Sequence, residues 1–179
     1  IAAHDGGVGA FFVGRLVAYK HVDSLIREFR KVQAVHKKAR LKIVGTGPDE
    51  RKLKALAKSL GVNAEFYGFV GEGEKNKIIK SSTCLVNPST VEGLGLILIE
   101  SMACGTPVIA RRLETYFFCN EGNAALYENE SEIAGKILGI MDNKKQFTKL
   151  SRNGMETAKD YSWDSVAEKV ENLYRSVLQ

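Results

Sequence analysis

The stretch at residues 84–110 most constrains the fold, because its pattern is that of a strand, a loop, a helix and a second strand. The apolar run at 84–86 is typical of a buried parallel strand, and Pro88 ends it because proline cannot donate a hydrogen bond to a neighbouring strand. Good helix formers occupy 96–104, and Gly105 follows as a C-terminal cap before the second short apolar strand. A unit of this kind predicts an α/β protein.

The expected helix at 96–104 is apolar on nearly all sides, as in a helix that is buried between a sheet and its neighbours. Glu100 lies in its middle. An unpaired buried carboxylate costs on the order of several kcal/mol, so Glu100 needs a charged or hydrogen-bonding partner, must face a cleft, or must be protonated. A cleft is the most economical interpretation, and it makes Glu100 a candidate ligand-binding residue.

The loop before this helix has the chemistry of a site for phosphate and hydroxyl groups. Gly93 and Gly95 allow the backbone to approach a ligand closely, and the free amides at the start of a helix bind anions. Glu92 does not suit a phosphate, because like charges repel, but it suits a neutral group that is rich in hydroxyls. Phosphate at the amides and hydroxyls at Glu92 and Glu100 together outline a nucleotide sugar.

Strands and helices alternate along the chain with connections of a few residues, which predicts a doubly wound parallel sheet flanked by helices. Residues 1–10 contain three glycines and are expected to be a lead or hinge segment, while residues 11–179 form one domain. The expected strands are at 11–14, 41–44, 63–70, 84–86, 107–110 and 124–127, and the expected helices are near 22–32, 53–60, 72–81, 96–104, 131–141, 145–159 and 162–178.

Two basic residues follow the first expected strand. Arg15 and Lys20 lie in the loop between the carboxyl end of that strand and the next helix, which is where open α/β sheets bind ligands. A guanidinium and an ammonium both suit a diphosphate. We therefore take both as candidate binding residues, and interpret the neighbouring His21 as a surface residue rather than a catalytic base.

A dinucleotide-binding dehydrogenase is one alternative, because Gly45-Thr-Gly47 follows the second expected strand. Glu50 occupies the place of the third glycine of the dinucleotide fingerprint, and Pro48 interrupts the turn. The fingerprint therefore fails, and NAD is the less favoured ligand.

Composition limits the classes of protein to which this chain can belong. The chain has 179 residues, 44% hydrophobic and 26% charged, as in a soluble globular domain. No apolar run approaches the roughly 18 residues of a membrane-spanning helix, and its start lacks the pattern of a secretory signal, although Ile1 in place of Met suggests a processed or excised piece. Three cysteines without a Cys-x-x-Cys spacing favour neither a disulfide framework nor a zinc site, so we expect a cytoplasmic location.

The formal net charge of +5 is compatible with nucleic acid, an anionic membrane or phosphorylated substrates. Solvated lysines and arginines on helix faces explain it most simply. Because no basic stripe is interleaved with aromatic residues, we expect no nucleic-acid partner.

Several motifs together resemble a known family. The run Glu92-Gly-Leu-Gly-Leu-Ile-Leu-Ile-Glu100, followed by Ser-Met-Ala-Cys-Gly-Thr-Pro-Val-Ile-Ala, resembles the signature of group 1 (family 4) retaining glycosyltransferases. Gly14-Arg15-Leu16 with Lys20, the Val-Gly-Thr-Gly-Pro turn at 44–48 and Tyr161-Ser-Trp163 are also similar to family segments. The resemblance covers roughly residues 11–178 and implies the carboxyl-terminal, donor-binding domain of an enzyme with two facing Rossmann-like domains, the GT-B fold.

The resemblance also implies roles. Gly14, Arg15 and Lys20 would bind the donor diphosphate, Glu92 the sugar hydroxyls and Glu100 the ribose hydroxyls, with Arg15, Lys20 and Glu92 acting in catalysis. The diphosphate site would be completed by the backbone amides of Gly93, Leu94, Gly95 and Leu96. The implied donor is a UDP- or GDP-sugar, and the implied reaction is metal-independent transfer with retention, without a cofactor, in polysaccharide or glycolipid assembly.

After Ala110 the similarity weakens, because the family usually continues with a Gly-Gly pair and a Glu. Here Arg111 and Arg112 are either additions to the diphosphate site or solvated residues. The aromatic run at 116–118 is either core or a patch for a partner domain.

The amino-terminal domain of the family, which supplies the acceptor site and usually the contact with the membrane, is missing from this chain. The expected partners are therefore a nucleotide-diphosphate sugar, that domain, and through it a lipid-linked acceptor at the inner face of the membrane. A second hypothesis follows, in which the chain by itself is a module that binds the donor without transferring a sugar.

Overall fold

The computed structural model describes residues 9–178, and its centre is a six-stranded parallel sheet with the strand order β3-β2-β1-β4-β5-β6. The predicted α/β architecture with a doubly wound parallel sheet is thereby confirmed. The strands are β1 (Gly9–Val13), β2 (Arg40–Val44), β3 (Ala64–Gly68), β4 (Cys84–Asn87), β5 (Val108–Arg111) and β6 (Ala125–Tyr127).

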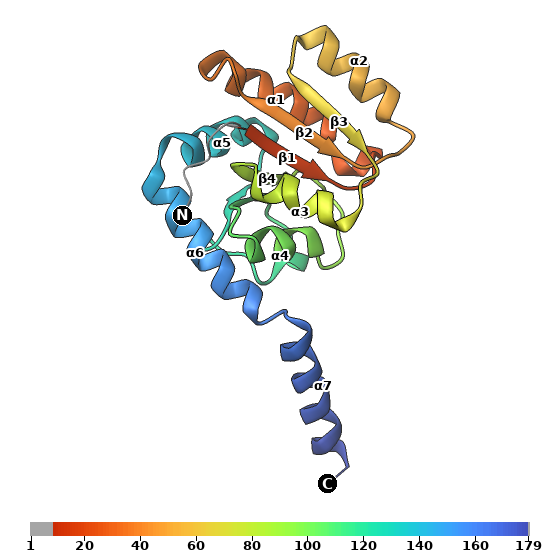
Figure 1. Cartoon of the computed structure of the whole chain (residues 1–179), viewed down its shortest axis with the longest axis vertical. Coiled ribbons are helices and arrows are strands. Elements are labelled where there is room, and N and C mark those ends of the chain that lie inside the picture. Colours follow the sequence, from red (N-terminus) through yellow and green to blue (C-terminus); the bar gives the residue numbers. More distant parts are fainter. Residues whose placement is uncertain (1–8, 179) are drawn as a thin grey trace.

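Helices cover both faces of the sheet (Figure 1). The α-helices are α1 (Val22–Val35), α2 (Glu50–Leu60), α3 (Glu72–Lys80), α4 (Leu96–Ala103), α5 (Ile133–Asp142), α6 (Lys144–Lys159) and α7 (Trp163–Val177). One hydrophobic cluster joins the sheet to α1, α2 and α5, and a second joins its other face to α3 and α4. Short 3-10 helices lie in loops at η1 (Ala18–Lys20), η2 (Glu114–Tyr116) and η3 (Glu130–Glu132).

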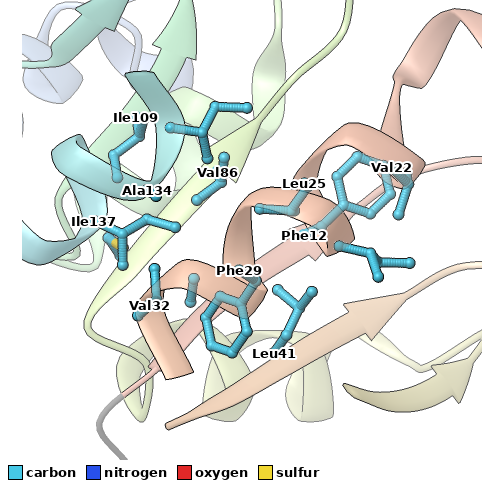
Figure 2. Packing of buried hydrophobic residues seen from close by; sticks show 14 of the residues in the cluster. Phe12, Val22, Leu25, Phe29, Val32, Leu41, Val86, Ile109, Ala134 and Ile137 are labelled. Carbon is cyan, nitrogen blue, oxygen red and sulfur yellow. The ribbon is translucent and has the colours of Figure 1, made fainter. Parts of the chain in front are cut away.

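The larger core forms because α1 is amphipathic. Val22, Leu25, Phe29 and Val32 recur every three or four residues, so they share one side of the helix and are buried against the sheet. Figure 2 shows these side chains meeting residues of β1, β2, β4, β5 and α5. Phe12 of β1 is 1% exposed at the centre of this contact.

The strand order reverses between β1 and β4, which are paired in parallel at the middle of the sheet. From β1 the chain winds outward to β2 and β3, whereas from β4 it winds the other way to β5 and β6. The connections that follow β1 and β4 therefore run to opposite sides of the sheet, and such a point is where open α/β sheets bind ligands.

The first strand begins at Gly9, so the expected lead segment at 1–10 is wrong for its last two residues. Gly9 and Ala10 pair with Arg40 and Leu41 of β2. Because Cβ atoms at Gly9 would lie 2.1 Å from the Arg40 carbonyl oxygen, only glycine fits there, and its presence signals a close strand contact rather than a hinge. The remainder of that expectation, residues 1–8, lies outside the described residues.

Helix α7 departs most from expectation. It begins and ends within a residue of the predicted helix, and Ser162 caps it by accepting a hydrogen bond from the Ser165 amide. It nevertheless projects away from the body of the domain, and none of its residues is buried (Figure 1). The helix has an exposed apolar face, which consists of Val166, Val170, Leu173, Tyr174 and Val177.

Helix α3 is polar and lies at the surface, with Ile78 and Ile79 buried beneath it. Within residues 9–178, no helix combines the length and the hydropathy that a membrane crossing requires.

Candidate functional site

The loops that leave β1 and β4 meet at the point where the strand order reverses. The first loop contains η1, and the second leads from β4 to α4. The Thr90 amide and hydroxyl both donate to the Tyr19 carbonyl oxygen, at 3.0 and 3.3 Å. These bonds hold the two loops together, so that Lys20 on one loop and Glu92 on the other come into contact.

Lys20 and Glu92 form an ion pair across these loops. The distance from Lys20 Nζ to Glu92 Oε1 is 2.5 Å, and only 14% and 15% of the two side chains are exposed. Shielding from water strengthens such a pair relative to one at an open surface. An ammonium has three N–H donors, so Lys20 can hold Glu92 and still donate to a phosphate.

Asn87, at the end of β4, fixes the position of Glu92 and was not predicted as a site residue. Its side-chain nitrogen donates to Glu92 Oε1 at 3.3 Å and to the Tyr116 hydroxyl at 3.0 Å. Its oxygen accepts from the Ser89 hydroxyl at 2.7 Å. A buried polar residue at the carboxyl end of a central strand is the one signal in the sequence that could have identified it.

Tyr116 connects the segment after β5 to this network. Burial raises the pKa of its phenol, and the negative charge of Glu92 raises it further, so the hydroxyl remains protonated. Tyr116 and Phe118 are buried, which confirms the core alternative for these two aromatic residues, whereas Phe117 is 73% exposed. Phe118 also packs against Tyr161, with ring centroids 5.3 Å apart.

The start of α4 presents backbone amides beside the ion pair. Gly95 is its N-cap with φ 75°, and no side chain caps the helix. The first amides of a helix have no acceptor within it, so they remain available to an anion. A Cβ atom at Gly95 would lie 2.6 Å from Tyr116 Cε1, which explains the glycine on steric as well as conformational grounds. These amides are flanked by the exposed apolar side chains of Leu94 and Leu96.

Glu100 has a charged partner, which is the first of the three predicted solutions. Lys75 of α3 places its Nζ 2.8 Å from Glu100 Oε2. The Glu100 side chain is also 40% exposed, so it combines an ion pair with access from solvent. Lys75 was not among the predicted site residues, because nothing in the spacing of α3 indicates that it faces α4.

The Gly45-Thr-Gly47 turn packs against the loop after β1 rather than serving as a dinucleotide fingerprint. The Leu16 amide donates to the Thr46 carbonyl oxygen at 2.9 Å. Added Cβ atoms would lie 1.9 Å from the Gly14 oxygen at Gly45 and 2.3 Å from the Leu16 oxygen at Gly47. These glycines therefore permit two backbones to touch, and their contact holds Gly14 in place.

Arg15 follows Gly14 on this loop and is exposed. Within the described chain, the prediction that Arg15 joins Lys20 is not supported by a contact, since its side chain makes no hydrogen bond or ion pair with another described residue. Arg15 is thus an exposed cation on the loop after β1 that has no acidic partner among residues 9–178.

Arg111 and Arg112 are engaged by acidic residues. Arg111 Nη2 lies 2.8 Å from Glu130 Oε1, and Glu130 also contacts His21 Nδ1 at 3.1 Å. Arg112 pairs with Glu121 and, at 3.7 Å, with Glu128. Arg112 is 51% exposed and pairs with exposed carboxylates, which agrees with the solvated alternative for this residue. Arg111 is 18% exposed and is held by Glu130 of η3.

No group of three or more His, Cys, Asp or Glu side chains within residues 9–178 has the arrangement to hold a metal ion.

Comparison with known proteins places these features in a family. Residues 4–157 match the family model of glycosyl transferases group 1. An uncharacterised glycosyltransferase of Methanocaldococcus jannaschii is 30% identical over an alignment of 186 positions, which covers 100% of this chain and 47% of that protein. The alpha-monoglucosyldiacylglycerol synthase of Acholeplasma laidlawii is 26% identical over 94% of this chain and 44% of that protein. The chain thus spans about half the length of these curated relatives.

Solved structures agree with the fold. The catalytic domain of the cholesterol-alpha-glucosyltransferase from Helicobacter pylori has a TM-score of 0.79 and 28% identity, covering 88% of this chain and 100% of that structure. Anabaena HepE, solved with UDP and glucose, has a TM-score of 0.83 over 97% of this chain and 49% of that protein, at 19% identity. The sheet, the family signature and these similarities agree: the chain belongs to the group 1 glycosyl transferases and has the Rossmann-like fold of GT-B enzymes.

Proposed function

We propose that this chain is the carboxyl-terminal, donor-binding half of a retaining hexosyltransferase that takes its sugar from a UDP- or GDP-sugar without a metal ion. The observation that carries the proposal is the Lys20–Glu92 ion pair, which lies where the strand order reverses and beside the uncapped start of α4. A cation and free amides suit a diphosphate, and a carboxylate beside them suits sugar hydroxyls.

The chemistry of this arrangement follows from charge. When the bond between the sugar and the diphosphate breaks, negative charge grows on the departing phosphate. Lys20, the free cation Arg15 and the amides at Gly93, Leu94, Gly95 and Leu96 would stabilise that charge. Preorganised donors of this kind contribute roughly 3 kcal/mol each to a transition state. Glu92, positioned by Asn87, would accept hydrogen bonds from the sugar, and Glu100 would accept them from the ribose.

The acceptor belongs to glycolipid or polysaccharide assembly in this proposal. Two curated relatives support a lipid-linked acceptor by their names, the Acholeplasma laidlawii synthase and a GDP-mannose-dependent phosphatidylinositol monomannoside mannosyltransferase of Corynebacterium glutamicum, 27% identical over 90% of this chain. We place the enzyme in the cytoplasm, at the inner face of the membrane, with the acceptor bound by an amino-terminal domain outside this chain.

A second function is favoured by the length of the chain. Because it spans about half of its relatives, the isolated chain would bind the donor without transferring a sugar. Assay of transfer by this chain alone and by the chain joined to its amino-terminal half separates the two. Transfer by the isolated chain would contradict the second function.

The site is tested by calorimetric titration with UDP, GDP, ADP and NAD in the wild type and in Glu100→Ala. We expect one nucleoside diphosphate to bind selectively, and the variant to bind it at least about tenfold more weakly, because a hydrogen bond to a charged group is lost. Glu168→Ala is the control, since it removes an exposed carboxylate of α7. Tight NAD binding, or unchanged binding in Glu100→Ala, would overturn the assignment.

A further inference from the structure

Lys75 occupies an unusual place for a residue of a polar surface helix. Its Nζ lies 2.8 Å from Glu100 Oε2 on α4 and 2.8 Å from Glu72 Oε2 on its own helix. Its side chain is 14% exposed, whereas that of Glu72 is 82% exposed. The ammonium is therefore covered on the side of α4, and Glu100 is the partner with which it is shielded from water.

The two oxygens of Glu100 are made different by this contact. Oε2 is inaccessible to solvent, and Lys75 Nζ is its close charged neighbour. The Glu100 side chain as a whole is 40% exposed. The carboxylate is thus paired through its buried oxygen, Oε2, and the exposure of the side chain lies at its other atoms.

Such an arrangement matters for binding, because a glutamate has three side-chain torsions and loses entropy when a ligand fixes them. An ion pair that fixes the carboxylate beforehand removes part of that cost. Burial lowers the pKa of Lys75, but its interactions with Glu100 and Glu72 outweigh burial and raise the pKa above the usual value, so the ammonium persists at neutral pH.

We propose that Lys75 is a positioning residue for ribose recognition: it holds Glu100 by Oε2, so that Oε1 is aimed at a ribose hydroxyl of the bound nucleotide. The inference rests on the proposed function, and it adds a residue of α3 to a site that is otherwise built from the loops after β1 and β4, helix α4 and the segment after β5.

The α3 helix provides a matched control. Lys77 lies two residues further along, is exposed and forms no ion pair with a described residue. Lys77→Met and Lys75→Met remove the same charge from the same helix, so both weaken any general attraction of the protein for an anion. Lys75→Met alone frees Glu100.

The test compares the dissociation constants of UDP and GDP with those of their 2′-deoxy and 3′-deoxy forms, measured by calorimetry in the complete chain. For the nucleotide that binds, the wild type is expected to lose about tenfold or more in affinity when the recognised hydroxyl is missing, since that hydroxyl bonds to a charged group. In Lys75→Met this loss should shrink to about threefold or less. We call this loss of affinity the deoxy penalty. Lys75→Arg, which keeps a cation at Glu100, should restore most of the deoxy penalty, and Lys77→Met should show the full penalty of the wild type.

The outcomes separate the inference from the function on which it rests. If the deoxy penalty is the same in Lys75→Met and in the wild type, the inference is overturned while nucleotide binding stands. If Lys75→Met and Lys77→Met change the penalty equally, Lys75 acts only through its charge and the inference is also overturned. If neither UDP nor GDP binds the wild type, the proposed function and the inference fail together.

Discussion

Lys20 Nζ and Glu92 Oε1 lie 2.5 Å apart although 72 residues separate them in the chain. One residue follows the central strand β1, and the other follows its neighbour β4. The ion pair joins the two halves of the sheet at the point where the strand order reverses, and the proposed donor site is built around it.

Loss of the Lys20 ammonium should weaken diphosphate binding strongly. We expect Lys20→Met to bind UDP or GDP roughly 10- to 100-fold more weakly than the wild type, because a charge-assisted hydrogen bond is removed and Glu92 is left without its cation. Isothermal titration calorimetry measures the change. Lys37→Met, at an exposed lysine outside the site, is the control, and equal weakening in both variants would contradict a specific role for Lys20.

A side chain at Gly95 should destabilise the fold. Gly95→Ala forces alanine into a left-handed conformation at φ 75° and brings its Cβ to 2.6 Å from Tyr116 Cε1. We expect a loss of about 2 kcal/mol or more in the free energy of unfolding, measured by urea denaturation. Gly93→Ala meets no atom within 4 Å and should change stability by less than about 0.5 kcal/mol. A smaller loss at Gly95 than at Gly93 would refute the steric argument.

Asn87 and Tyr116 should be energetically coupled. Asn87→Ala leaves the Tyr116 and Ser89 hydroxyls without their partner in a buried place, at a cost of about 1–3 kcal/mol of stability. A double-mutant cycle with Tyr116→Phe should give a coupling energy of at least about 0.5 kcal/mol. Strictly additive losses would show that the two side chains do not stabilise one another.

Helix α7 should be dispensable for the stability of the domain. None of its residues is buried, so removing the helix should cost little. We expect a chain that ends at Ser162 to have the same free energy of unfolding in urea as the complete chain, within about 0.5 kcal/mol. A chain that ends at Gly154 also loses Ala158 and Tyr161, which pack on the core, and should be clearly less stable. If the shorter deletion were equally damaging, α7 would contribute contacts to the fold.

The Lys75–Glu100 ion pair predicts a dependence of stability on alkaline pH. The folded pKa of Lys75 lies above the usual 10.5, so its contribution is complete below about pH 10.5 and is lost as the pH rises through the folded value. The difference in unfolding free energy between the wild type and Lys75→Met should therefore be constant near neutrality and shrink above pH 10.5. A difference that grew in alkali would have the wrong sign and would exclude the ion pair.

Local pattern was sufficient to predict the elements of this fold. Alternating apolar runs and amphipathic segments predicted the strands and helices, usually to within two residues, because hydrophobic spacing and helix caps act over a few neighbouring positions. The same local logic failed at Gly9, where the reason for glycine is the neighbouring strand β2. It also failed for α7, whose apolar stripe predicts a helix but not the surface that would cover it.

In the candidate site too, some residues could be predicted from local pattern and others could not. The residues between Glu92 and Glu100 could be recognised from the sequence because their spacing within one loop and helix carries the family signature. Tyr116 and Lys75 could not, because each acts through a partner on another element, and the only signal for Asn87 is its place at the end of a central strand. The sequence by itself determined the parallel sheet, the glycine-rich loop and the charged residues around it. Only the tertiary structure decided which cation pairs with which carboxylate, since ion pairs depend on distance in space and not on spacing along the chain.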